Sequence, residues 1–127
     1  RVEVGRFPDE DRAEESVWNL HILGSGEDED TDFVILSGYL RRNGPEGFGQ
    51  AIASGLLEGV TLAEMHKTDA KWNEFVDHLS KYFAESIYDT ARRALQSAAA
   101  QMDFSLDLSL QAPEVEIHEP VRKEPSN

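Results

Sequence analysis

Two pairs of side chains between residues 66 and 78 have a spacing that metal chemistry could use. His66 and Asp69 stand three residues apart, and Glu74 and His78 stand four apart on one face of a predicted helix. A metal site needs three or four such ligands that converge on one point. Nothing in the sequence indicates convergence, and a helix with a polar outer face accounts for all four residues. We therefore expect no metal here.

The acidic run Glu-Asp-Glu-Asp at residues 27–30, followed by Asp32, is a second candidate for ion binding. It lacks the alternating ligands, central glycine and distal glutamate of an EF-hand. The Gly-Ser-Gly at residues 24–26 is not a Gly-x-Ser-x-Gly nucleophile elbow and is too short for a phosphate-binding loop. We interpret residues 24–32 as a solvated hairpin loop. Carboxylates are so numerous that no pair stands out as acid and base. We expect no catalytic residue, no cofactor and no enzyme activity.

The chain has a strong negative charge. Its 127 residues include 25 acidic and 12 basic side chains, a net charge of −13 at pH 7. Such a field repels nucleic acid and anionic membranes and attracts basic proteins over long range. No apolar run approaches the roughly 20 residues of a membrane-spanning helix. The sequence has no cysteine, which permits a reducing compartment. We expect a soluble, cytoplasmic protein that binds neither nucleic acid nor membrane.

Three segments alternate between apolar and polar residues as β-strands do: residues 1–7, 17–23 and 33–42. We expect the first strand to begin upstream of Arg1. The third strand has apolar residues on both faces at its ends. It therefore needs two covers, one from its own helices and one from a second subunit. The acidic loop is too short for a crossover helix, which predicts that the second and third strands pair antiparallel.

A long helix is the other main element that the sequence predicts. Residues 48–66 have helical spacing that three glycines interrupt, which indicates a short or broken helix. Thr68 or Asp69 is the expected N-cap of a second helix that runs to about Gln101. At about 1.5 Å per residue this helix is about 50 Å long, more than one small sheet covers. Its alanine-rich end allows close packing on another helix, so we expect a homo-oligomer, either a dimer or a tetramer.

The C-terminal part of the chain contains one more strand pattern. Residues 104–110 alternate without exception, with leucine or phenylalanine at every second position, and predict a strand that Pro113 ends. Residues 118–127 are charged and contain proline, and we expect a disordered tail. Residues 1–117 are predicted to form a single domain. The expected fold class is α+β, with an antiparallel sheet packed against one long helix.

This order of elements resembles that of the SecB family of protein-export chaperones. Residues 32–40, Asp-Phe-Val-Ile-Leu-Ser-Gly-Tyr-Leu, are similar to the central strand of the family, which has an aromatic residue after its glycine. Residues 81–89, Lys-Tyr-Phe-Ala-Glu-Ser-Ile-Tyr-Asp, resemble its Pro-Tyr-x-Arg-Glu helix, with Lys81 in place of the proline and Ala84 in place of the arginine. Residues 102–115 are similar to its Leu/Pro-rich stretch.

The resemblance implies an ATP-independent holdase that assembles as a dimer of dimers and binds unfolded clients along apolar grooves between sheet and helix. Two features of the family pattern are missing. Residues 105–110 lack the prolines, and no strand is evident between residues 42 and 69, where the family has one before its helix. The groove residues that the resemblance implies are Phe33, Leu36, Tyr39, Leu56 and Leu57.

The leading hypothesis is a SecB-like chaperone or adaptor that binds unfolded or partly folded proteins through apolar surface on an acidic oligomer. The alternative is a single-partner binding protein of antitoxin or immunity type, whose acidic face neutralises one basic protein. An enzyme ranks third. A holdase suppresses the aggregation of several unrelated clients with little salt sensitivity, whereas an inhibitor binds one folded partner and weakens steeply with salt.

Overall fold

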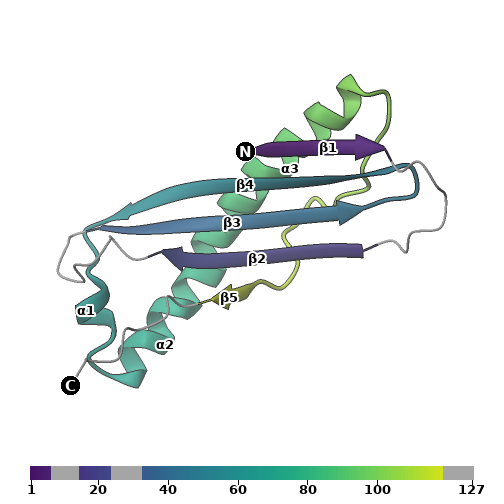
Figure 1. Ribbon diagram of the computed structural model, residues 1–127. Helices are drawn as coiled ribbons and strands as arrows, with labels where there is room; N and C mark the ends of the chain where they lie inside the picture. The colour runs from purple at the N-terminus through teal and green to yellow at the C-terminus, as the bar shows by residue number, and fades with distance from the viewer. Residues whose placement is uncertain (7–14, 24–32, 119–127) are drawn as a thin grey trace, which may run out of the picture.

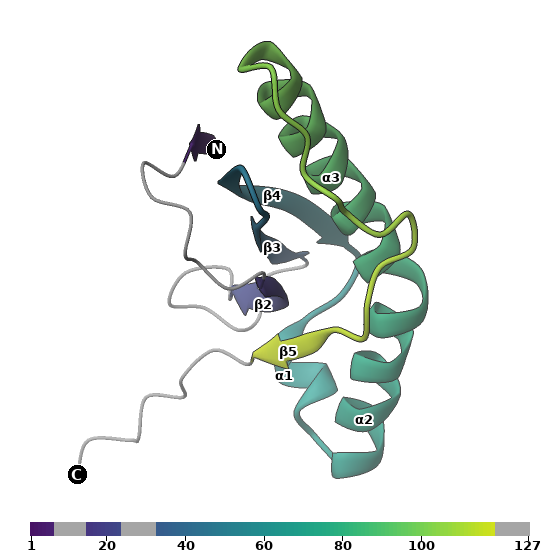
Figure 2. The same ribbon diagram turned by 90° about the vertical axis from the view of Figure 1, so that its right-hand side faces the viewer.

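The computed structural model describes residues 1–6, 15–23 and 33–118, and in them the chain forms a five-stranded sheet with a long helix across one face (Figures 1 and 2). The strand order is β1-β4-β3-β2-β5. Strands β1 to β4 pair antiparallel, whereas β5 runs parallel to β2. The α+β class is thus confirmed, with a mixed sheet in place of the purely antiparallel one that we predicted. The strands are β1 (Val2–Arg6), β2 (Glu15–Leu23), β3 (Phe33–Asn43), β4 (Gly47–Glu58) and β5 (Glu116–His118).

The three strands expected from alternation are confirmed as β1, β2 and β3, and the antiparallel pairing of β2 with β3 is confirmed as well. Trp18, Leu20 and Ile22 of β2 all face the helix and are buried. They lie opposite Leu40, Gly38 and Leu36 of β3, so the two strands contribute one continuous apolar surface.

The helix predicted over residues 48–66 is wrong for most of its length. Gly47–Glu58 is the twelve-residue strand β4, and only Leu62–Met65 forms a helix, α1. The glycines that we interpreted as helix breakers allow close packing instead. A Cβ added to Gly49 would lie 2.6 Å from Leu106 Cδ1 and 2.9 Å from Leu95 Cδ2. Strand β4 occupies the region where the SecB resemblance implies a strand before the helix.

The long helix is confirmed. Segments α2 (Asp69–His78), η1 (Leu79–Phe83) and α3 (Ala84–Gln101) follow one another without a break, and η1 has π-helical hydrogen bonding. The Thr68 hydroxyl accepts a hydrogen bond from the Lys71 amide at 3.1 Å, so Thr68 is the N-cap. Ala99, in the alanine-rich end from which we inferred an oligomer, is buried within this chain. The helix residues that are buried are Phe75, Leu79, Ala84, Ile87, Tyr88, Ala91, Leu95 and Ala99.

The strand predicted over residues 104–110 is wrong, because this segment is extended but pairs with no strand of the described sheet. It runs back beside α3 (Figure 2). Phe104, Leu106 and Leu108 are buried, whereas Leu110 is 77% exposed. The alternation therefore reflects an extended backbone with one buried side. His118, which we assigned to the tail, ends β5, and the predicted acidic loop and the rest of the tail lie outside the described residues.

Candidate functional site

The two faces of the sheet differ in what covers them. The helix and residues 104–110 lie together on one face, as the edge-on view in Figure 2 shows. In β3, Val34, Leu36 and Leu40 point to this face and are buried. The residues between them point to the opposite face, because successive side chains of a strand alternate. No described helix or strand packs on that opposite face, which we call the open face.

Apolar side chains from β2, β3 and β4 gather on the open face. Leu23, Ile35 and Leu56 lie in one row across the three strands, and Tyr39 lies opposite Ile52 four residues away from Ile35 and Leu56 along each strand. The exposed fractions of Leu23, Ile52 and Leu56 are 46%, 45% and 57%. The row formed by His21, Ser37 and Ser54 separates the two groups. Exposed apolar side chains of this size on one face of a sheet are typical of binding sites. We call this surface the apolar patch, and it consists of Leu23, Phe33, Ile35, Tyr39, Ile52 and Leu56.

A polar network borders the apolar patch on the β1 side. The Gln50 side-chain oxygen accepts hydrogen bonds from Tyr39 Oη and from Arg41 Nη1, each at 3.1 Å. The Gln50 amide nitrogen donates to Glu3 Oε2 at 2.7 Å. The Arg41 guanidinium also lies 5.4 Å from the centroid of the Phe48 ring. These contacts fix the tyrosine ring at the border, so the patch has an amphipathic edge with a defined orientation.

The structure divides the five predicted groove residues between the two faces. Phe33, Tyr39 and Leu56 lie on the open face. Leu36 is 1% exposed in the core, and Leu57 is partly buried against the core. These two cannot share a surface with the other three, because each is one residue out of phase with the open face. The space between sheet and helix in which we expected a groove is filled with core side chains here.

Sequence reasoning missed Leu23, Ile35 and Ile52 of the apolar patch. Ile35 could have been found, because it lies two residues after Phe33 and therefore on the same face of the predicted strand. Ile52 could not, because its face depends on β4 being a strand, and we had assigned that region to a helix. Leu23 could also have been found, because it ends the strand predicted over residues 17–23 and is out of phase with its buried residues.

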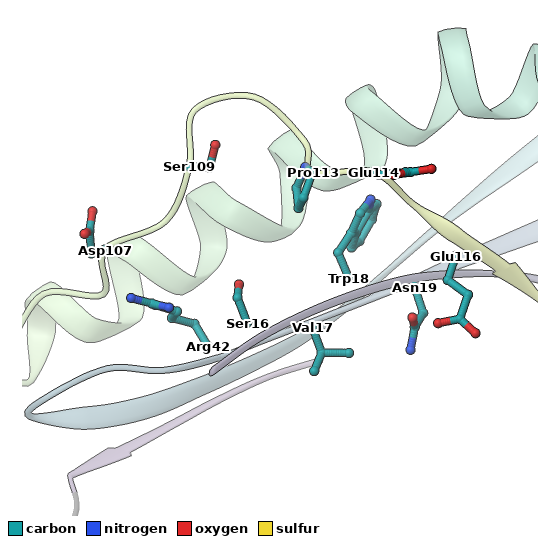
Figure 3. Close-up of a pocket in the computed structure, with 10 residues that line it drawn as sticks. All are labelled: Ser16, Val17, Trp18, Asn19, Arg42, Asp107, Ser109, Pro113, Glu114 and Glu116. Carbon is teal, nitrogen blue, oxygen red and sulfur yellow. The ribbon is translucent and has the colours of Figure 1, made fainter. Parts of the chain in front are cut away.

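A separate polar cleft of about 720 Å³ lies on the helix side of the sheet, between β2 and residues 107–116 (Figure 3). The indole Nε1 of Trp18 is buried there and has no hydrogen-bond partner among the described residues. Figure 3 shows this nitrogen directed toward the stretch that carries Pro113 and Glu114. Arg42 and Asp107 line the same cleft with opposite charges. The cleft holds no histidine, cysteine or lysine in its lining, and we assign no reaction to it.

The histidines make aromatic contacts in place of the metal site considered above. The His66 ring stacks on Trp72 with 4.4 Å between centroids, and the His78 ring lies 4.7 Å from that of Tyr82. On the open face, His21 of β2 stacks on His118 of β5 at 4.7 Å. Within residues 1–6, 15–23 and 33–118, no three histidine or carboxylate side chains are placed to hold a metal ion.

The clear pKa shifts belong to side chains in or beside the helices. Hydrogen bonds from Lys67 and then Lys71 lower the pKa of Glu64 to about 2. Burial raises the pKa of the Tyr88 phenol, whose hydroxyl donates to the Ser109 carbonyl at 2.6 Å. Glu64 links α1 to α2 through Lys71. Tyr88 links α3 to the segment that contains Ser109. Neither lies on the open face.

Comparisons of this chain with protein-family models, curated proteins and solved structures found no match. The resemblance to the SecB family therefore stays a prediction, carried by the quoted sequence segments and by the order of elements. In the described part of the chain, no helix combines the length and apolar composition that a membrane crossing requires.

Proposed function

We propose that this chain is a protein-binding module of the chaperone or adaptor type, which holds unfolded or partly folded polypeptides on the apolar patch. The observation that carries this proposal is the exposure of Leu23, Ile52 and Leu56 on one face of the sheet. Non-native polypeptides present apolar side chains at many positions, and an open apolar surface accepts them without requiring one fixed shape.

Two further features support binding of this kind. The polar border formed by Gln50, Arg41 and Glu3 offers hydrogen-bond partners beside the apolar patch, as the rims of protein interfaces do. The net charge of −13 opposes non-specific aggregation through the exposed apolar surface and attracts basic segments of a client. The arrangement of strands followed by one long helix is compatible with the SecB-like resemblance. A homo-oligomer, dimer or tetramer, belongs to the same proposal.

The test is an aggregation assay with several unrelated unfolded proteins, each mixed with the chain at stoichiometric amounts. Leu56→Ser is the test variant, because Leu56 is the most exposed side chain of the patch, at 57%. Leu110→Ser is its matched control, since Leu110 is also an exposed leucine but directly follows Ser109, whose carbonyl accepts a hydrogen bond from Tyr88 of α3. Both changes are on the surface and should alter the free energy of unfolding by no more than about 0.5 kcal/mol.

We expect the unmodified chain and Leu110→Ser to suppress aggregation equally, and Leu56→Ser to bind clients about tenfold more weakly. That loss corresponds to about 1.4 kcal/mol, within the range for one buried leucine contact. Equal activity of the two variants would remove the apolar patch from the mechanism. Failure to protect any client, together with tight and strongly salt-dependent binding of one folded basic protein, would favour the antitoxin or immunity-type alternative.

A further inference from the structure

A row of four polar side chains crosses the open face of the sheet. His118 of β5 lies beside His21 of β2, and their rings are in contact on this face. On the other side of β2, His21 lies opposite Ser37 of β3, which in turn lies opposite Ser54 of β4. We call these four residues the polar row. Because neighbouring strands are about 4.8 Å apart, the polar row is about 14 Å long.

The polar row separates the two groups of the apolar patch. The apolar residues nearest to the row each lie two positions from one of its members along the same strand, or about 7 Å away. They are Leu23, Ile35 and Leu56 on one side of the row and Tyr39 and Ile52 on the other. A polypeptide that contacts both groups therefore lies over the polar row.

The histidine pair, His21 and His118, gives one end of the polar row a charge that depends on pH. The two rings are stacked, with 4.7 Å between their centroids and 14° between their planes. The His118 side chain is 40% exposed, so protons from the solvent reach it. Histidine is the side chain whose charge ordinarily changes between about pH 5 and pH 8. The charge of the open face beside the apolar patch therefore depends on pH in this range.

The charged and titratable groups that face the histidine pair come from β3 and β5. Glu116 Oε1 of β5 lies 3.6 Å from His118 Nε2. From β3, the phenol of Tyr39 lies diagonally opposite His21, and Arg41 lies two residues further along the strand. Glu116 is thus the carboxylate next to the pair. The local charge changes from negative, with both rings neutral, to positive, with both rings protonated.

We propose that protonation of the histidine pair releases the bound polypeptide, so that the chain holds its clients at about pH 7.5 and releases them at about pH 5.5. This inference rests on the proposed function and adds its regulation. A polypeptide that lies over the polar row displaces water from the imidazole rings. A charged ring loses far more solvation energy than a neutral ring, so covering the pair favours its neutral state. The client and the added protons therefore compete.

Linkage between binding and protonation sets the size of the effect. Each ring that must lose a proton before the client binds weakens the affinity by up to about tenfold for each pH unit below its titration range. The interval from about pH 7.5 to about pH 5.5 brackets the ordinary titration of histidine. Over this interval we expect the affinity to fall about tenfold if one ring must be neutral and up to about 100-fold if both must be.

The experiment measures binding of an uncharged peptide, Gln-Leu-Thr-Ser-Thr-Leu-Gln with blocked ends and a neutral fluorophore, to the full chain at these two pH values. The peptide has no titratable group, so any pH dependence belongs to the protein. The test variant carries both His21→Gln and His118→Gln. The matched control is His78→Gln, since the His78 ring packs on Tyr82 and Phe83 in the helix. The circular dichroism spectrum should be the same at both pH values, which separates release from unfolding.

We expect the unmodified chain and His78→Gln to bind the peptide at least about tenfold more weakly at the lower pH, and the double variant to change by less than about twofold. In an NMR titration, the peptide should lower the pH at which His21 and His118 titrate and leave that of His78 unchanged. Binding without pH dependence, or pH dependence that persists in the double variant, would overturn the inference while the proposed function stands. If neither the peptide nor any unfolded protein binds at either pH, both are refuted.

Discussion

Replacing Gly38 with alanine tests how closely the helix packs on the sheet. Gly38 lies in β3 on the face that carries α3, and a Cβ added there would be 2.6 Å from both Ile87 Cγ2 and Trp18 Cη2. Carbon atoms in contact prefer about 3.5 to 4.0 Å, so the new methyl group would be about 1 Å too close to two rigid neighbours. Overpacking of this kind costs about 1 to 3 kcal/mol of unfolding free energy.

The matched control is Gly55→Ala, on the neighbouring strand and against the same helix residue. A Cβ added to Gly55 would lie 3.7 Å from Ile87 Cδ1 and 3.9 Å from Ile87 Cγ1, which is ordinary contact. Alanine also restricts the unfolded chain, so this variant should be as stable as the unmodified protein or about 0.5 kcal/mol more stable. The difference between the two variants isolates steric overlap from the general effect of adding a methyl group to a strand.

The assay is urea unfolding followed by far-ultraviolet circular dichroism and by the combined fluorescence of Trp18 and Trp72. We expect Gly38→Ala to be less stable than Gly55→Ala by about 1 to 3.5 kcal/mol, with an unchanged dependence on urea concentration. Equal stabilities would mean that the helix does not lie this close to β3. A loss confined to Gly55→Ala would contradict the register of β3 and β4.

Three further predictions concern the helices. Tyr88→Phe removes the donor to the Ser109 carbonyl and should lower the unfolding free energy by about 1 kcal/mol at neutral pH. Burial raises the folded-state pKa of Tyr88 above its ordinary 10.0. The higher unfolding free energy of the unmodified protein relative to Tyr88→Phe should therefore disappear as the pH rises through the folded-state pKa. A difference that persists above this pH would contradict burial of the phenol. Thr68→Ala should cost about 1 kcal/mol in urea unfolding and Thr68→Ser much less, since serine keeps the N-cap oxygen. The pKa of Glu64 can be measured by a carboxyl NMR titration at low salt. We expect a pKa of about 2 in the unmodified protein and a higher pKa in Lys67→Ala. A pKa near the ordinary 4.5 in both proteins would rule out the ion pair.

Local periodicity was sufficient to predict the elements whose pattern comes from one-sided burial. Trp18, Leu20 and Ile22 alternate because β2 has one covered face, and the helix from Asp69 repeats its apolar residues every three or four positions. The N-cap at Thr68 followed from local hydrogen-bonding chemistry. In each case the residues of the element itself carry the information.

Elements defined by contacts with distant parts of the chain were missed. The glycines of β4 suggest helix breaking, yet Gly49 is needed because Leu95 and Leu106 lie against it. Strand β5 is a three-residue parallel strand that exists only because β2 offers an edge. Residues 104–110 have the alternation of a strand, yet they pair with no strand of the described sheet. Misassignment of β4 then hid Ile52 from the predicted binding residues.

The most direct test of the central claim is to map, by two-dimensional amide NMR, where an unfolded client binds on the labelled chain. The account predicts that the largest chemical-shift changes fall on Ile35, Tyr39, Ile52 and Leu56, which lie together on the open face. The amides of the buried face of α3 should change little. Changes concentrated on the indole of Trp18 and the polar cleft, or no changes with any client, would contradict the account.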